Sequence, residues 1–295
     1  MRHEHQRVEE RNARPGIGLA LGGGFARGFA HLGILGVLEQ HRIPVTHIAG
    51  TSVGSILGAA YASGAPLSRI VECCKGLRFK DIARWRVSRL GLASNQRLAE
   101  LIERVFESRQ FEDLRIPMAV VATDLSTGEP VVFTQGNLTD AIRASCAFPG
   151  LFEPVEIGTR CLADGGLVAP VPTRAVQQLG AATVVGVSVG LQDGYRGAPK
   201  NVFQVVSRAV SAAQKHQMEV WERAADLVLR PEVQGLAWDD FARAEEAIEA
   251  GAAAAKRALP RIEKLLSKAA PNDSEKAEAV EAEDKAYLWL AETLR

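Results

Sequence analysis

The stretch IAGTSVGSILGAAYASGAPL, residues 48–67, runs for twenty positions without a charged residue. Two interpretations of it compete. Gly50, Gly54 and Gly58 recur every four residues, a spacing that lets membrane helices pack closely, and twenty residues are enough to span a bilayer. The same stretch contains Gly-Thr-Ser-Val-Gly, which is typical of a serine presented on a sharp turn between a strand and a helix.

The composition of this stretch favours the turn over the membrane span. It holds four glycines, three serines, a threonine and a proline, and few large apolar residues, so it is too polar for a typical membrane helix. We expect a buried strand over 45–50 and a helix from about Gly54 to Gly64. Between them, Ser52 would sit on the turn, flanked by Gly50, Thr51, Val53 and Gly54, near the positive end of the helix dipole.

Strands and helices alternate along most of the remaining chain, which indicates an α/β fold with a mostly parallel sheet covered by helices on both faces. Apolar runs predict strands at 16–21, 117–125, 130–136, 182–190 and 225–231, with a hairpin over 153–166. Helices are predicted from the glycine cluster after residue 21 to about residue 39, and over 138–148, 201–224 and 239–268.

Composition and charge divide the chain of 295 residues into four parts. We expect a polar extension over 1–15, a main domain over 16–235, a helical appendage over 236–268, and an acidic, flexible tail over 269–295 that ends in a short helix. The amino terminus lacks the apolar core of a signal peptide.

The overall composition is that of a soluble globular protein. Apolar residues make up 47% and charged residues 24%, and the net charge of zero gives no support for a nucleic-acid partner. Four cysteines without a CxxC pair favour a reducing compartment. We therefore expect a cytoplasmic protein, with peripheral contact at the inner membrane surface as a further expectation.

A glycine-rich loop, LGGGFARG at residues 21–28, follows the first strand and opens a helix. Backbone N–H groups of Gly23, Gly24 and Phe25 could converge there on the oxyanion that forms when a serine attacks an ester. Arg27 would add positive charge or anchor the loop. A nucleotide-binding loop is the alternative, but the spacing departs from G-x-G-x-x-G and no Walker lysine is present.

The base that would activate Ser52 is harder to assign, because no histidine is well placed for a serine triad. The six histidines are His3, His5, His31, His41, His47 and His216. His216 is the only one that follows the likely acids, but it lies within a predicted surface helix, and His31 is expected to be packed or capping. Asp164, at a strand end before Gly165 and Gly166, could serve as a carboxylate base, or the three residues could form a simple turn.

Three motifs in order, GGGFARG, GTSVG and DGG, together with VATDLSTGE (121–129) and ASCAFPGLFEPV (144–155), resemble the patatin-like phospholipase family, in particular its bacterial members related to neuropathy target esterase. The resemblance covers about residues 16–235. It implies a three-layer α/β/α sandwich and a dyad in which Ser52 is the nucleophile and Asp164 its base. The implied oxyanion loop comprises Gly22, Gly23, Gly24, Phe25, Ala26, Arg27 and Gly28.

The resemblance also implies that the substrates are acyl esters of lipids and that neither a metal nor another cofactor takes part. One residue departs from the narrower family form G-G-G-x-Arg-Gly, because Phe25 stands where the third glycine would be. A phenylalanine would be strained there if the position requires a positive φ. The alternative function is a catalytically weak regulatory or acyl-lipid-binding protein that keeps the fold.

A basic segment at residues 66–94 carries seven Arg or Lys residues against two acidic ones, with Phe79, Trp85, Leu90 and Leu92 among them. Such a segment could border the mouth of the site and contact anionic lipid headgroups. The alternative is a solvated helical face with ordinary core anchors. The sequence predicts no oligomeric state.

Overall fold

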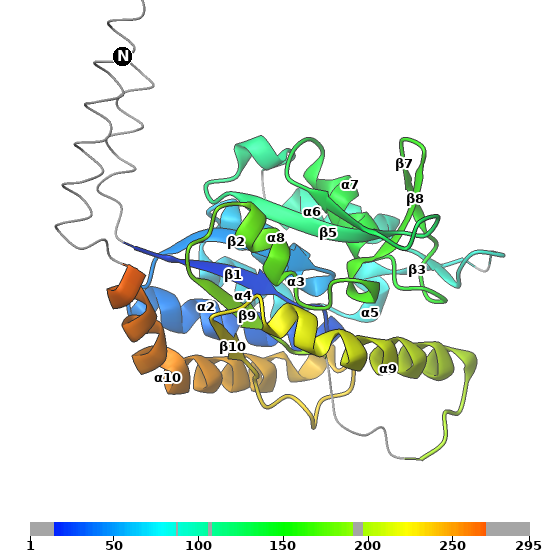
Figure 1. Cartoon of the computed structure of the whole chain (residues 1–295). Helices are drawn as coiled ribbons and strands as arrows, with labels where there is room; N and C mark the ends of the chain where they lie inside the picture. Colours follow the sequence, from blue (N-terminus) through cyan, green and yellow to red (C-terminus); the bar gives the residue numbers. More distant parts are fainter. Residues whose placement is uncertain (1–14, 87, 106–107, 191–196, 270–295) are drawn as a thin grey trace, which may run out of the picture.

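A mixed sheet forms the centre of the computed structural model, which describes residues 15–86, 88–105, 108–190 and 197–269 (Figure 1). Within these residues the sheet has eight strands in the order β10-β9-β1-β2-β5-β8-β7, and β6 also pairs with β5. Its strands are β1 (Ile17–Leu21), β2 (Val45–Thr51), β5 (Met118–Asp124), β6 (Pro130–Phe133), β7 (Val155–Ile157), β8 (Arg160–Asp164), β9 (Val184–Val187) and β10 (Leu227–Leu229).

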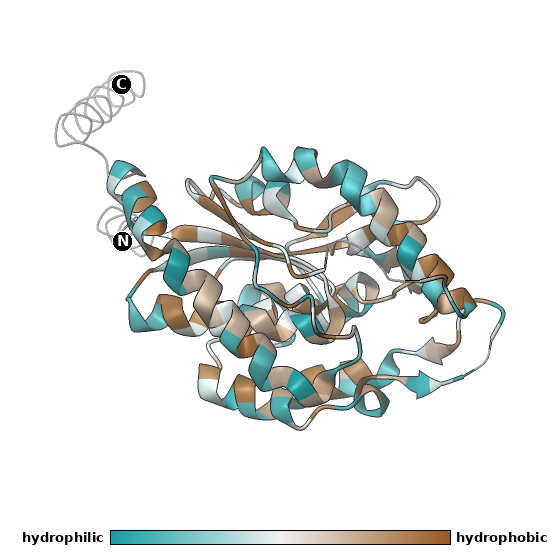
Figure 2. Cartoon of the chain, turned by 90° about the horizontal axis from the view of Figure 1, so that it is seen from below, coloured by the Kyte–Doolittle hydropathy of each residue, from teal (hydrophilic) through white to brown (hydrophobic). Residues whose placement is uncertain are grey.

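The strands from β10 to β5 are parallel, and β6, β7 and β8 add antiparallel pairs at one side. Alternation along the central strands sends their side chains to two different cores. Leu19 and Leu21 of β1 belong to the larger core, whereas Ala20 belongs to a smaller core on the other face. Figure 2 shows the central strands as largely apolar.

Helices cover both faces of the sheet, so the three-layer arrangement is confirmed. The larger core includes side chains of α2 (Ala30–Gln40), α3 (Val53–Ala62), α4 (Leu67–Lys75) and α10 (Ala244–Ala269). The smaller core includes side chains of α8 (Thr173–Gln178) and Trp221 of α9 (Val202–Glu222). The sheet contributes mainly alanines to this second core, which brings the helices that cover it close to the strands.

Helix α10 packs directly on α2, and the two helices lie side by side in Figure 1. Ala247, Ala255 and Ile262 of α10 are buried in the larger core. The division of the chain at residue 236 stays a prediction, but the structure integrates this helix into the same core as the sheet. The predicted amino-terminal extension and acidic tail lie, apart from Pro15 and Ala269, outside the described residues.

Most of the predicted elements are found within one to four residues of their expected ends, including the hairpin β7–β8, whose turn contains Gly158 with a φ of 60°. The basic segment differs from a continuous helical face. It begins with α4 and α5 (Phe79–Ile82), but β3 (Arg84–Trp85) and β4 (Ala93–Ser94) then form a small antiparallel ribbon. Two elements that the sequence analysis did not assign, α6 (Gln96–Val105) and the short 3-10 helix η2 (Phe111–Asp113), follow it.

Residues 48–67 do not form a membrane span. They comprise the end of β2, the turn at Ser52, helix α3 and the start of α4. Among the described residues, no helix has both the length and the apolar character needed to cross a membrane.

Candidate active site

Ser52 lies on a sharp turn where β2 meets α3, as the Gly-Thr-Ser-Val-Gly pattern predicted. Its φ of 55° falls in the left-handed region, which non-glycine residues rarely adopt. The Ser52 N–H donates to Oγ of Ser145 at 2.9 Å, and that hydroxyl donates to the Val121 carbonyl at 2.6 Å. These buried hydrogen bonds join the turn to β5 and to the end of α7 (Leu138–Ser145).

Gly54 allows the helix after the turn to approach the sheet closely. A Cβ atom at this position would lie 2.1 Å from the carbonyl oxygen of Leu21, at the end of β1. Any other residue would push α3 away from the strand and move Ser52 with it. The glycine two residues after the serine is therefore a packing requirement of the turn.

Asp164 is at the end of β8, which pairs with β5, and its side chain is directed toward Ser52. The side chain is only 4% exposed. Its Oδ1 atom accepts a hydrogen bond from the Gly166 N–H at 2.8 Å, and the Ser52 hydroxyl lies close enough to the carboxylate to influence its pKa. The structure thus brings together the two side chains that the sequence placed in a dyad.

Burial raises the pKa of the Asp164 carboxyl to about 6, and the hydrogen bond from Gly166 and the nearby Ser52 hydroxyl oppose this shift. The thiol of Cys146 lies next to both side chains, and its pKa is raised by burial and by the Asp164 charge. Asp164 is therefore ionised at neutral pH while being more basic than an ordinary carboxylate.

The glycine-rich loop between β1 and η1 (Phe25–Phe29) lies against Ser52. The N–H groups of Gly22 and Gly23 donate to the carbonyls of Val187 and Pro170, at 3.0 and 3.2 Å. Gly23 is thus not one of the free donors expected from the sequence. Within the described part of the chain, the N–H groups of Gly24 and Phe25 have no backbone acceptor, and both residues line the cavity beside Ser52.

Phe25 adopts the left-handed conformation that the sequence analysis considered, with a φ of 51°. Its ring packs edge-on against Phe148 and Trp238, with centroids 5.4 and 5.1 Å apart. Aromatic packing of this kind compensates for part of the backbone strain at a non-glycine residue.

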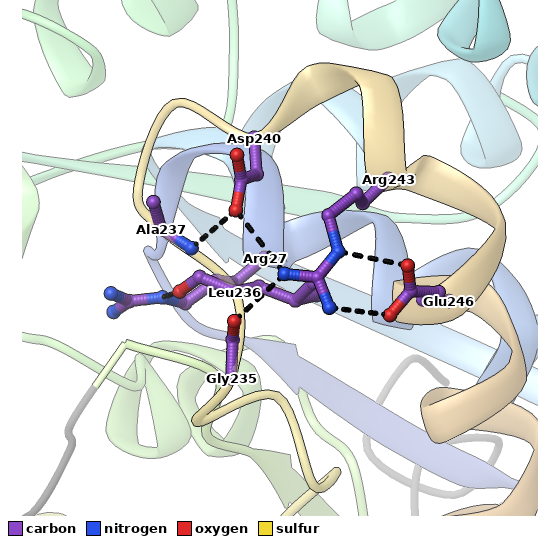
Figure 3. Close-up of polar contacts among 7 residues, drawn as sticks. All are labelled: Arg27, Gly235, Leu236, Ala237, Asp240, Arg243 and Glu246. Atoms are coloured by element: carbon purple, nitrogen blue, oxygen red, sulfur yellow. Dashed lines mark hydrogen bonds and ion pairs between the residues drawn. The ribbon is translucent and has the colours of Figure 1, made fainter.

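Arg27 connects the glycine-rich loop to the segment that precedes α10 (Figure 3). Its Nε atom donates to the Leu236 carbonyl at 2.9 Å, and the N–H of the adjacent Ala26 donates to the Trp238 carbonyl at 3.0 Å. Arg27 also lines the cavity beside Ser52. It therefore anchors the loop and adds positive charge to the site.

Arg243 also holds the segment that precedes α10. The guanidinium of Arg243 donates to the Gly235 carbonyl at 2.8 Å and forms two hydrogen bonds to Glu246, at 2.8 and 2.6 Å (Figure 3). Asp240 accepts from the N–H of Ala237 at 2.8 Å. These contacts fix Trp238, whose side chain forms part of the cavity wall.

Two cavities meet at Ser52. One, of about 70 Å³, has a polar wall that includes Arg27, Asp164, Ser207, Ser211 and Gln214. The other, of about 80 Å³, is almost entirely apolar, and Ile56, Leu57, Leu98, Leu101 and Phe241 are among its lining residues. An ester with a polar part and a hydrocarbon chain matches this arrangement.

Neither of the histidines considered in the sequence analysis joins the site. His31 is fully buried, and its Nε2 atom is 2.9 Å from the Gly22 carbonyl oxygen; burial lowers its pKa to about 4, so it is neutral. It is packed, as predicted. His216 is exposed on α9, also as predicted.

Several residues around the dyad could not be recognised as site residues from the sequence. Ser145 and Cys146 lie in a block that was noted for its resemblance, but no role was assigned to either. Ser207, Gln214 and Trp238 come from a helix and a loop far along the chain that carry no motif. No group of three His, Cys, Asp or Glu residues among those described is arranged to hold a metal ion.

The fold and this site define an α/β sandwich protein with a serine on a strand–helix turn beside a buried aspartate and a glycine-rich loop. Residues 19–176, more than half of the chain, match the family model described as patatin-like phospholipase. The chain belongs to the patatin-like phospholipase family.

The relatives of this chain include NTE family proteins of bacteria, which agrees with the resemblance found in the sequence. An uncharacterised NTE family protein of Mycobacterium tuberculosis is 35% identical over 181 residues, which is 60% of this chain and 50% of that protein. Human patatin-like phospholipase domain-containing protein 6 is 34% identical over 190 residues, 60% of this chain and 14% of that protein. The chain thus spans about half the length of the mycobacterial relatives it matches.

Among solved structures, VipD from Legionella pneumophila shares the fold. The TM-score is 0.55, with 13% sequence identity, and the match covers 84% of this chain and 67% of VipD.

Proposed function

We propose that this protein is a serine acyl hydrolase that cleaves acyl esters of lipids through a Ser52–Asp164 dyad and an acyl-enzyme intermediate. The observation that carries the proposal is the placement of Ser52 beside the buried carboxylate of Asp164, close enough to influence its pKa, on a turn where Ser52 lines two cavities of different polarity. Family membership supports the same reaction class.

In the first half of the reaction, Asp164 takes the hydroxyl proton while Oγ of Ser52 attacks the ester carbonyl carbon. The N–H groups of Gly24 and Phe25 stabilise the resulting oxyanion. The C–O bond of the ester then breaks, and the alcohol leaves with the proton from Asp164. In the second half, Asp164 activates a water molecule that releases the acid and restores Ser52.

The two cavities divide the substrate between them. The acyl chain occupies the apolar cavity between α3, α6 and the glycine-rich loop, where its transfer from water is favourable. The polar alcohol portion occupies the cavity that contains Arg27, Ser207 and Ser211. No metal or other cofactor has a role in this proposal.

The dyad is tested by the kinetics of Ser52→Ala, Asp164→Asn and the double variant on a short soluble ester. Because the two residues act as one unit, each single variant should lose about 10³-fold or more in kcat, and the double variant should be no worse. His216→Ala is the control and should keep wild-type activity. Retention of most turnover by Asp164→Asn, or a large loss in His216→Ala, would contradict the dyad.

The proposal includes peripheral contact with an anionic membrane through residues 66–94. Trp85 is 65% exposed and Leu90 70% exposed on the ribbon that also carries Arg84, Arg86 and Arg89. Phe79 packs against both Trp85 and Trp238, with ring centroids 5.6 and 5.9 Å apart. The exposed residues are therefore connected to the wall of the active-site cavity.

Co-sedimentation with vesicles that contain phosphatidylserine tests this contact. Charge reversal at Arg84, Arg86 and Arg89 should abolish most of the binding, since each basic residue near the surface contributes about 1 kcal/mol. Reversal of the exposed residues Lys256, Lys264 and Lys268 on α10 is the matched control. Equal binding of the two triple variants would eliminate this surface, and with it the proposed location at the inner membrane face in the cytoplasm.

A further inference from the structure

Helix α9 packs against the turn that directly follows Asp164, although it belongs to none of the recognised motifs. Of its 21 residues only Trp221 is buried. The residues that α9 presents to the site are Ser207, Val210, Ser211 and Gln214, which line the cavity beside Ser52. The helix lies beyond the residues that match the family model.

The two ends of α9 are fixed by packing and hydrogen bonding. Near its start, Phe203 lies against Trp238, with ring centroids 4.7 Å apart. At its end, Trp221 is buried and its carbonyl accepts a hydrogen bond from Oγ1 of Thr173 at 2.8 Å. The middle of the helix is thereby held over η3 (Gly165–Leu167), the short turn that follows Asp164.

Gln214 is linked to Asp164 through a single residue. Its Nε2 atom donates to the Gly166 carbonyl at 2.7 Å, and the N–H of the same glycine donates to Oδ1 of Asp164 at 2.8 Å. A Cβ atom on Gly166 would lie 3.0 Å from that Oδ1 atom and 3.2 Å from Nε2 of Gln214. Gly166 therefore contacts both the Gln214 amide and the Asp164 carboxylate.

A neighbouring glutamine makes a comparable hydrogen bond without reaching the site. Gln217 donates from Nε2 to the Leu167 carbonyl at 3.1 Å, and it lies outside the set of residues that line the cavity beside Ser52. Gln214 and Gln217 satisfy two successive carbonyls of a turn that is too short to satisfy them itself.

We propose that Gln214 is a positioning residue for Asp164: by holding the Gly166 carbonyl, it keeps the Gly166 N–H on the carboxylate and the carboxylate directed at Ser52. The inference rests on the proposed function, because Asp164 is taken to be the base. Gln214 touches neither the reacting hydroxyl nor the ester carbonyl in this role.

The groups that face Asp164 make its titration a specific measure of this linkage. They are the Ser52 hydroxyl, the Cys146 thiol and the Gly166 N–H, and the Arg27 guanidinium lines the same cavity. Residues of α9 that line the cavity are uncharged. Replacement of Gln214 by a neutral residue therefore removes no charge, and a change in the Asp164 titration would report the weakened Gly166 hydrogen bond.

Gln214→Met tests the proposal, because methionine nearly fills the same volume but lacks the donor. The pH profile of kcat/KM on a short soluble ester should have its acidic limb near pH 6 in the wild type. In Gln214→Met this limb should move upward by about half a pH unit or more, and kcat should fall about 10-fold with KM unchanged. Gln217→Met, the matched control, should keep the wild-type limb.

A second readout separates this inference from the proposed function. In protein labelled with ¹³C at the aspartate side-chain carboxyl, the Asp164 signal, assigned by its loss in Asp164→Asn, should titrate at higher pH in Gln214→Met than in Gln217→Met. An unchanged Asp164 midpoint in folded Gln214→Met, or in the smaller variant Gln214→Ala, would overturn the positioning role. If the wild type proves inactive but the Asp164 midpoint is still shifted in Gln214→Met, only the proposed function is overturned.

Discussion

Three residues of the site are held in states that cost free energy. Ser52 and Phe25 have φ values of 55° and 51°, and left-handed backbone at a non-glycine residue costs roughly 1–2 kcal/mol. Asp164 is a buried carboxyl whose ionised form is penalised by desolvation. Such strain is common where a protein fixes reacting groups in advance.

Asp164→Asn should make the protein more stable at pH 8 while it removes activity. The folded-state pKa of about 6 lies above the ordinary value of 3.8, so ionisation favours the unfolded state and the penalty appears as the pH rises through 6. The gain in unfolding free energy at pH 8 should be on the order of 3 kcal/mol. It should shrink as the pH falls from 6 to 4, which urea unfolding of both proteins at pH 8 and pH 4.5 would measure. A difference that is the same at both pH values would contradict the buried, ionised state of Asp164.

Phe25→Gly should be more stable than Phe25→Ala by about 1 kcal/mol, because both variants lose the aromatic packing but only glycine relieves the left-handed backbone. Phe29, buried with a φ of −58°, is the matched control. There the order should reverse, with the glycine variant the less stable. Chemical denaturation of the four variants provides the comparison, and the same order at both positions would contradict the strain at Phe25.

Residue-level prediction was most specific where chemistry restricts the choice of residue. The Gly-Thr-Ser-Val-Gly pattern located the turn, and the lack of a suitable histidine directed attention to Asp164. Gln214 and Trp238 could not be found in this way, since they reach the site only through the placement of α9 and of the segment before α10. The use of the Gly23 N–H by Pro170 is likewise a tertiary contact that no local pattern encodes.

At the level of elements, the contact between α2 and α10 depends on small residues. A Cβ atom on Gly33 would lie 1.9 Å from the carbonyl oxygen of Ile248, and one on Gly251 would lie 1.9 Å from that of Ala30. The two helix backbones thus approach each other too closely for any side chain at these positions.

Gly33→Ala and Gly251→Ala should each destabilise the protein by about 3 kcal/mol, because the helices must separate to admit the methyl group. The loss should occur although alanine is the better helix former. Gly76, at the end of α4, has nothing within 4 Å of its hypothetical Cβ atom and provides the control. Thermal unfolding of the three variants checks this, and a Gly251→Ala protein as stable as Gly76→Ala would contradict the close packing.

Prediction of elements was best for long apolar strands and long helices. Strands β1, β2, β5 and β9 are buried along most or all of their length, so most of their residues are apolar. The region from 66 to 116 was predicted poorly because its elements are short and amphipathic, and the two-residue strands β3 and β4 have no detectable period.

At the level of the whole molecule, the segment after residue 235 takes part in both the core and the site. Leu259 and Ile262 are buried in the larger core, while Trp238 lines one cavity at Ser52 and Phe241 lines the other. Composition alone could not reveal this, since an alanine-rich helix can equally form an appendage.

A chain that ends at residue 235 should lose cooperative unfolding, because the larger core would be exposed where α10 packs on α2. A chain that ends at Ala269 retains every described residue after 235 and is the reference. Near-UV circular dichroism during thermal unfolding distinguishes the two. A cooperative transition in the shorter chain would support the division at residue 236 that the sequence analysis predicted.

The central claim is that Ser52 is an activated nucleophile, and the most direct test is labelling of the purified protein with a fluorophosphonate probe. We predict rapid labelling of the wild type, strongly slowed labelling of Asp164→Asn, and none of Ser52→Ala. A folded wild type that the probe does not label would contradict the claim and favour the acyl-lipid-binding alternative.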